Sequence, residues 1–154
     1  MASFRWNHSN EVFVPEIDRE HQALYRMAEE ARLAMKSASD SAQVTAGIRA
    51  LLSETEDHFS HEERLMADSR FWGSDWHKRQ HQTARKHLRN AIRAQEKGDQ
   101  AKAERELKSL VSWLNDHTSI ADRILGSYLR NHERSEESEP KSYGATPTPR
   151  QRPQ

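Results

Sequence analysis

The sequence contains no cysteine, which excludes disulfide bonds, thiolate metal sites and cysteine nucleophiles. It also has no apolar run approaching the roughly 18 residues that a membrane-spanning helix needs. Its 24 Lys and Arg residues equal its 24 Asp and Glu residues, so the formal net charge is zero. This balance indicates neither a nucleic-acid partner nor a membrane partner.

The N-terminus lacks the basic flank and apolar stretch of a signal peptide, so we expect a cytoplasmic protein. The length of 154 residues fits a single domain. Only 34% of the residues are hydrophobic, which suffices for a core if they lie on amphipathic faces. Because no extended apolar face would then remain to be covered, we expect a monomer.

Proline is scarce and unevenly placed, since Pro15 is followed by no further proline until Pro140. This long gap permits uninterrupted helices. The last part of the chain, residues 133–154, is rich in Pro, Ser and charged residues. It has too few apolar residues to offset chain entropy, and we predict a disordered tail there.

Apolar residues recur at three- and four-residue steps in four segments between these limits. The predicted helices run from an N-cap at Asp18 to about residue 37, over 42–67, from Ser74 or Asp75 to a C-terminal stop at Gly98, and over 100–129. We expect Gly73 to end the second helix. Short connections favour antiparallel neighbours. The sequence therefore predicts an all-α domain over residues 1–132, an up-down-up-down four-helix bundle preceded by an irregular arm over residues 1–17.

Nine histidines are the unusual feature of the composition. His58 and Glu62 are four residues apart and share one face of the second predicted helix. The same spacing joins His77 and His81 on the third helix. With His21 on the first helix and His117 on the fourth, every predicted helix carries a potential inward ligand.

Asp122 is harder to place, because five helical steps put it about 140° around the axis from His117. A role for Asp122 would need a local bulge or a site that lies between two faces. Five imidazoles and two carboxylates, with no sulfur, suit iron, manganese or zinc. Seven ligands are too many for one ion, but they suit two ions if the carboxylates bridge. An ion bound by three histidines then has a complete coordination sphere, and an ion bound by two histidines keeps one coordination position open.

The alternative is that these histidines are ordinary surface or core residues. A single His pair at four-residue spacing on a helix is most often exposed. A bundle without metal would, however, leave five inward imidazoles desolvated, which is costly unless they find partners. Four histidines do not join the pattern: His8, His61, His87 and His132. We expect His61 and the neighbouring Glu63 to be exposed to solvent.

Four segments resemble the hemerythrin family in its bacterial single-domain form: "IDREHQAL", "HFSHEERLM", "HKRQH" and "WLNDHTSIAD". The resemblance spans about residues 4–130, and all of the family's ligand positions are filled. It implies two iron ions bridged by Glu62, Asp122 and an oxo or hydroxo group. One iron would be held by His77, His81 and His117, and the iron that binds dioxygen by His21 and His58.

The resemblance implies reversible dioxygen binding, for oxygen carriage, storage or delivery, rather than an enzyme. One alternative is an oxygen or redox sensor that acts through a separate partner. Another is an oxidase-like or peroxidase-like di-iron enzyme. Ferritin-like di-iron enzymes use Glu-x-x-His on two helices, and this motif is absent from the sequence.

Reversible oxygen binding requires a dry pocket. We predict that it is lined by Leu24, Phe59, Trp113, Leu114 and Thr118. Asp18, Asp116 and backbone carbonyls are the candidates that we consider for accepting hydrogen bonds from ligand imidazoles, and the spacing does not choose among them.

The chain departs from the family pattern at three places. Family members usually have Tyr-Pro at the position of Phe71-Trp72, an aromatic residue at Ala84 and Ile at Thr118. None of these departures touches a ligand, but Ala84 and Thr118 bear on oxygen affinity and on resistance to autoxidation.

Overall fold

A computed structural model describes residues 4–37 and 40–138 of the chain. The helices are α1 (Pro15–Lys36), α2 (Ser41–Asp68), α3 (Ser74–Glu96), α4 (Gln100–His117) and α5 (Arg123–Ser138), with a 3-10 turn at His8–Asn10 and a π-helical segment at Thr118–Asp122. The described residues form no strand, which confirms the all-α class. None of these helices is long and apolar enough to cross a bilayer.

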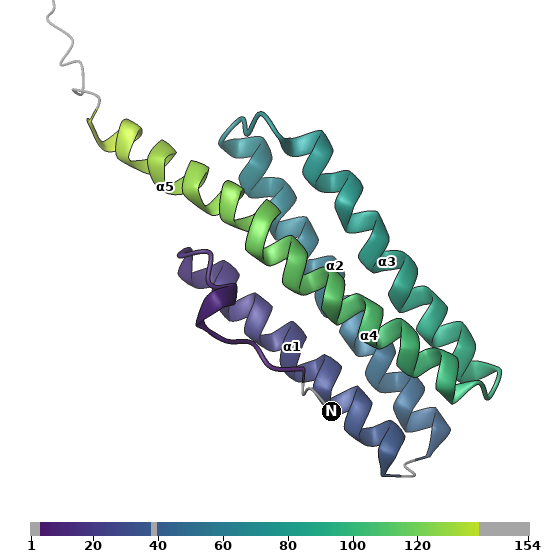
Figure 1. Ribbon diagram of the computed structural model, residues 1–154. Coiled ribbons are helices and arrows are strands. Elements are labelled where there is room, and N and C mark those ends of the chain that lie inside the picture. Colours follow the sequence, from purple (N-terminus) through teal and green to yellow (C-terminus); the bar gives the residue numbers. More distant parts are fainter. Residues whose placement is uncertain (1–3, 38–39, 139–154) are drawn as a thin grey trace, which may run out of the picture.

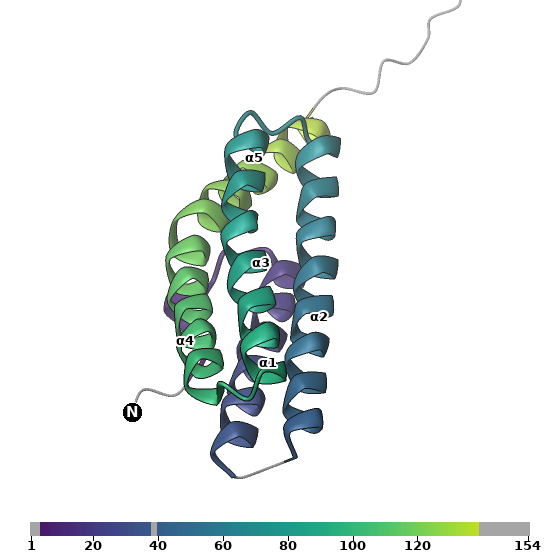
Figure 2. The same ribbon diagram turned by 90° about the vertical axis from the view of Figure 1, so that its right-hand side faces the viewer.

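The helices form an antiparallel bundle in which α5 continues the direction of α4 (Figure 1). Helix α1 packs against α2 and α4, and α3 packs against the same two helices (Figure 2). This arrangement confirms the up-down-up-down four-helix bundle. Helix α5 continues to Ser138, so it includes six residues of the predicted tail, counted inclusively from residue 133. The rest of the predicted tail lies outside the described residues.

The first helix begins four residues earlier than predicted, because its N-cap is Val14 and not Asp18, and Pro15 is its first residue. Proline is well suited to the first helical position, where its missing N–H has no partner to lose. Asp18 instead accepts hydrogen bonds from the backbone N–H groups of Val12 (2.8 Å) and Phe13 (3.2 Å). This carboxylate therefore fastens the N-terminal arm, residues 4–14, to the start of α1.

Helix α2 ends at Asp68, and the left-handed residue that follows it is Arg70. The sequence prediction that Gly73 ends this helix is therefore wrong. Arg70 has a φ of 55°, and the Phe71 N–H donates to the Met66 carbonyl over 2.8 Å. These features form a Schellman motif, which usually carries glycine at the left-handed position. Gly73 has a φ of −91° and lies at the start of α3. A Cβ at Gly73 would lie 2.9 Å from the Phe71 ring, so close packing is the role of this glycine.

Two apolar clusters fill the bundle, one on each side of a polar layer. Along α1, His21 lies between Ile17 of the smaller cluster and Leu24 of the larger one. Along α2, Glu62 lies between Phe59 of the larger cluster and Met66 of the smaller. The smaller cluster also contains Val12 and Val14 from the N-terminal arm, Phe71 from the connection after α2, and Leu125 and Leu129 from α5.

An open groove of about 550 Å³ lies beside α5 and carries exposed Trp72 and Ile120. The monomer stays a prediction.

Candidate metal centre

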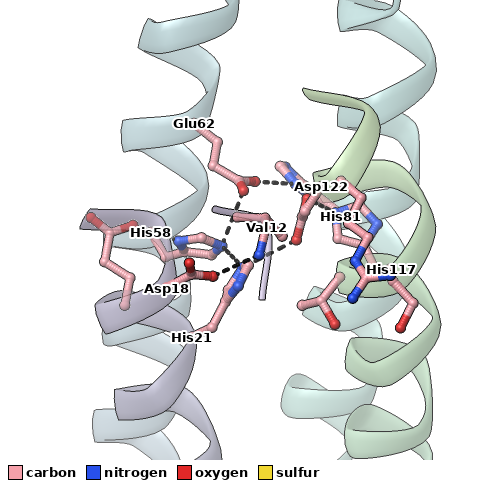
Figure 3. A network of polar contacts seen from close by, with 12 residues as sticks. Val12, Asp18, His21, His58, Glu62, His81, His117 and Asp122 are labelled. Atoms are coloured by element: carbon pink, nitrogen blue, oxygen red, sulfur yellow. Dashed lines mark hydrogen bonds and ion pairs between the residues drawn. The ribbon is translucent and has the colours of Figure 1, made fainter. Parts of the chain in front are cut away.

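All seven predicted ligands meet in the polar layer between the two apolar clusters, and each is at most 3% exposed: His21, His58, Glu62, His77, His81, His117 and Asp122. They come from α1, α2, α3, α4 and the end of the π-helical segment. Figure 3 shows Glu62 and Asp122 directed toward the surrounding imidazoles.

Glu62 faces a different group of histidines with each of its oxygens. Its Oε1 lies 3.5 Å from His58 Nε2. Its Oε2 lies 3.3 Å from His77 Nε2 and 3.1 Å from His81 Nε2. A carboxylate placed in this way can bridge two ions.

Asp122 divides its oxygens in the same manner. Its Oδ2 lies 3.1 Å from His21 Nε2. Its Oδ1 lies 3.0 Å from both His77 Nε2 and His117 Nε2. The donor atoms fall into two groups, one of His21, His58, Glu62 and Asp122 and one of Glu62, His77, His81 and His117, each lying within 4.8 Å of one another.

These separations fit donors around cations. Two ligands bonded at about 2.1 Å and at a right angle are about 3.0 Å apart. The described structure also leaves Glu62 Oε1 and both Asp122 oxygens buried without a hydrogen bond. Buried polar atoms of this kind are normally satisfied. The donor set therefore fits two cations bridged by the two carboxylates.

The π-helical segment explains how Asp122 reaches the site five residues after His117. Its backbone hydrogen bonds span five residues instead of four, so one extra residue fits into the turn. Asp122 thereby returns to the face of His117, and the two side chains lie 3.0 Å apart. The π-helical segment is therefore the local bulge that we gave, from the sequence, as one of two ways for Asp122 to reach the site.

The electrostatics of the layer also suit a cation. Burial and the charge of Asp122 favour protonation of Glu62, but His58, His77 and His81 outweigh them and hold its pKa well below the usual range. Burial acts to lower the pKa of His77, yet the neighbouring carboxylates of Asp122 and Glu62 raise it to about 9. A proton on His77 thus offsets part of the carboxylate charge, and a bound cation would displace this proton.

A family profile described as "Hemerythrin HHE cation binding domain" matches residues 12–129. The chain belongs to the hemerythrin family. It is also similar to a myohemerythrin from Theromyzon tessulatum, with 28% identity over 120 residues. That alignment covers 77% of this chain and 88% of the relative.

In this hemerythrin domain, three ligand imidazoles have an acceptor near Nδ1. His58 Nδ1 lies 2.6 Å from Glu20 Oε2. His117 Nδ1 lies 2.9 Å from Gln80 Oε1, and His81 Nδ1 lies 3.4 Å from Glu63 Oε1. Each imidazole can therefore donate its Nδ1–H outward and keep Nε2 for a metal.

These acceptors differ from the side chains considered as candidates from sequence. Asp116 is exposed, and Asp18 bonds to the backbone of the arm. Glu63 and His61 are not fully exposed, since their side chains are 31% and 25% accessible. The sequence carried no local signal for the acceptors, because Glu20 and His58 meet only where α1 packs on α2.

Four of the five predicted oxygen-pocket residues line one cavity of about 10 Å³: Leu24, Phe59, Trp113 and Leu114. Thr118 is buried but lies outside this cavity, and its hydroxyl donates to the Asn115 carbonyl over 3.2 Å. The Phe59 ring stacks on His81 with centroids 3.7 Å apart. Trp113 stacks on His117 at 4.4 Å.

Proposed function

We propose that this hemerythrin-family protein binds dioxygen reversibly at a non-haem di-iron centre, for oxygen carriage, storage or delivery. The observation that carries the proposal is that each of the two carboxylates has one oxygen near the group of three histidines and the other near the group of two. Two ferrous ions held there would supply the electrons that dioxygen needs to bind reversibly.

The unequal number of histidines leaves room for a small ligand on one side only. His77, His81 and His117 would complete one coordination sphere together with the bridges. His21 and His58 would leave one position of the other sphere free. Five neutral imidazoles with only two carboxylates favour reversible binding over oxidation chemistry, because few anionic ligands stabilise high-valent iron.

The surroundings of the site exclude water, which reversible oxygen binding requires. Leu24 lies about one turn from His21, and Phe59 follows His58 directly. Both side chains are buried and line the cavity that we propose as the oxygen pocket. A lining of this kind limits the entry of water and protons, which would otherwise release reduced oxygen and leave ferric iron.

We further propose that the protein is a cytoplasmic monomer and that it is not an enzyme. A separate partner would accept the oxygen.

The experiment that tests this function follows oxygen and iron together. The protein is reduced without oxygen, its iron is assayed, and its visible spectrum is followed as oxygen is admitted and then removed. We expect about two irons per chain, as the two donor groups require, and a band that appears and disappears reversibly. Iron without a reversible band would favour an enzyme or a redox sensor, and failure to take up iron would contradict the metal centre.

A substitution tests the assignment of the two-histidine side. His58→Ala removes one of its two imidazoles, so we expect a folded bundle that no longer binds oxygen. Circular dichroism checks the fold, and the visible band checks binding. His87→Ala is the matched control, because His87 pairs with Glu106 outside the site. Normal oxygen binding by the His58 variant would show that the ligand assignment is wrong.

A further inference from the structure

Among the described residues, Glu20 is the carboxylate that lies nearest to the outward-facing Nδ1 atom of a ligand imidazole. Its Oε2 lies 2.6 Å from His58 Nδ1, and its Oε1 lies 2.5 Å from His61 Nδ1. Both oxygens of one carboxylate on α1 are thus bound to imidazoles on α2. We infer that Glu20 is a positioning residue that sets the metal affinity of the two-histidine side alone.

The geometry fixes the tautomer of His58. When Nδ1–H donates to the carboxylate, the lone pair of His58 is left on Nε2, which faces Glu62 and His21. A charge-assisted hydrogen bond is shorter and stronger than a neutral one. It also makes the imidazole a better electron donor toward a metal.

His61 gives the contact its rigidity. A carboxylate with one free oxygen could rotate away from His58, but the second oxygen of Glu20 is held by His61. His58 and His61 are three residues apart on α2, so they offer two donors on neighbouring parts of one surface. Glu20 is 28% exposed, and the bond that it makes is sheltered by the almost fully buried His58.

The three-histidine side has weaker acceptors of a different kind. His117 donates to Gln80, a neutral amide, over 2.9 Å. Glu63 lies 3.4 Å from His81 Nδ1, and Arg85 lies 3.9 Å from the same Glu63 oxygen and offsets its charge. The strongest outer acceptor therefore belongs to the side where we propose that oxygen binds.

This inference rests on the proposed metal centre. A titration with cobalt(II) distinguishes a failure of the metal centre from a failure of the role given to Glu20. Metal-free full-length protein is titrated with cobalt(II), and the affinity and visible spectrum of each bound equivalent are recorded. Loss of an outer hydrogen bond typically weakens metal binding by about 10- to 100-fold. We expect Glu20→Ala to weaken one equivalent by about that factor and to leave the other unchanged.

Two further variants separate positioning from a loss of folding. Glu20→Gln keeps the shape and an amide acceptor, so we expect a smaller loss with a shifted cobalt band for the same equivalent. Gln80→Ala should weaken the other equivalent. Glu16→Ala is the matched control, since Glu16 is exposed on the same helix.

Each outcome decides one of the two claims. Wild-type protein that fails to bind two cobalt ions would overturn the metal centre itself. If wild type binds two ions and Glu20→Gln matches it in both affinities and in spectrum, the role of Glu20 is overturned, whether or not Glu20→Ala folds. Equal weakening of both equivalents by a folded Glu20→Ala variant would also overturn it.

Discussion

Single aromatic residues link the packing of the bundle to the metal centre. The Phe59 ring stacks on His81, nearly parallel at 7°, while the Arg85 guanidinium lies 5.1 Å from its centroid. The same ring lines the apolar cavity. Phe59 therefore fixes the orientation of one ligand and shields the site from water.

Replacing this residue tests both roles. We expect Phe59→Ala to lower the free energy of unfolding of the metal-free protein by about 3–5 kcal/mol, because a buried ring is lost and a cavity remains. Denaturant unfolding measures this change. In the iron-loaded protein, autoxidation should become faster as water enters.

The exposed Leu33 offers a control for the loss of side-chain atoms, since Leu33→Ala should change stability by no more than about 0.5 kcal/mol. A Phe59→Ala protein as stable as the Leu33 variant would contradict the role given to the ring.

Among individual residues, the candidate ligands His58, Glu62, His77 and His81 could be predicted because four-residue spacing places each pair on a shared helix face. The outer acceptors Glu20 and Gln80 could not, since each meets its imidazole across a helix–helix contact. Asp18 was one of the candidates for this role, but its partners are amides of an arm that folds back on α1.

At the scale of elements, the π-helical segment Thr118–Asp122 is the feature on which the site depends. It holds one residue more than the α-helix would, and it leaves α4 and α5 in a common direction. An extra residue in an ordinary helix would rotate everything beyond it by about 100°.

Deleting one residue from this segment is therefore expected to preserve the fold and the site. Removing the exposed Ser119 should convert the segment to an ordinary α-helix, because Asp122 would then follow His117 by four positions and keep its face. We expect a folded bundle that still binds two metal ions. Circular dichroism and metal titration measure the result.

Deletion of the exposed Ser112, within the regular part of α4, is the matched comparison. It should rotate His117 and all of α5 out of register and prevent a stable fold. Equal damage from the two deletions would show that the π turn does not absorb a residue.

For the molecule as a whole, the two apolar clusters hold the bundle at both ends of the polar layer. The last buried side chain of the described chain is Leu129, and the Tyr128 hydroxyl donates to the Ser69 carbonyl over 2.6 Å. Residues 133–138 continue α5 with exposed side chains only. The smaller cluster is therefore complete before the predicted tail begins.

This arrangement predicts how far the chain can be shortened. A protein that ends at His132 should lose no more than about 0.5 kcal/mol of stability and bind metal normally. One that ends at Ser127 loses the buried Leu129 and the Tyr128 hydrogen bond, so we expect a loss of about 3 kcal/mol or more. Thermal unfolding distinguishes the two, and a large loss in the longer protein would contradict the domain boundary at 132.

The sequence by itself predicted the helical class, the antiparallel order and the candidate ligands. Helical periodicity and local spacing are properties of neighbouring residues, and the family resemblance added Asp122. Only the tertiary structure decided how the carboxylate oxygens divide between two histidine groups and which residues support the imidazoles. It also revealed the π turn that brings Asp122 to the site. These features depend on how the helices and the arm pack against one another, and no local pattern contains that information.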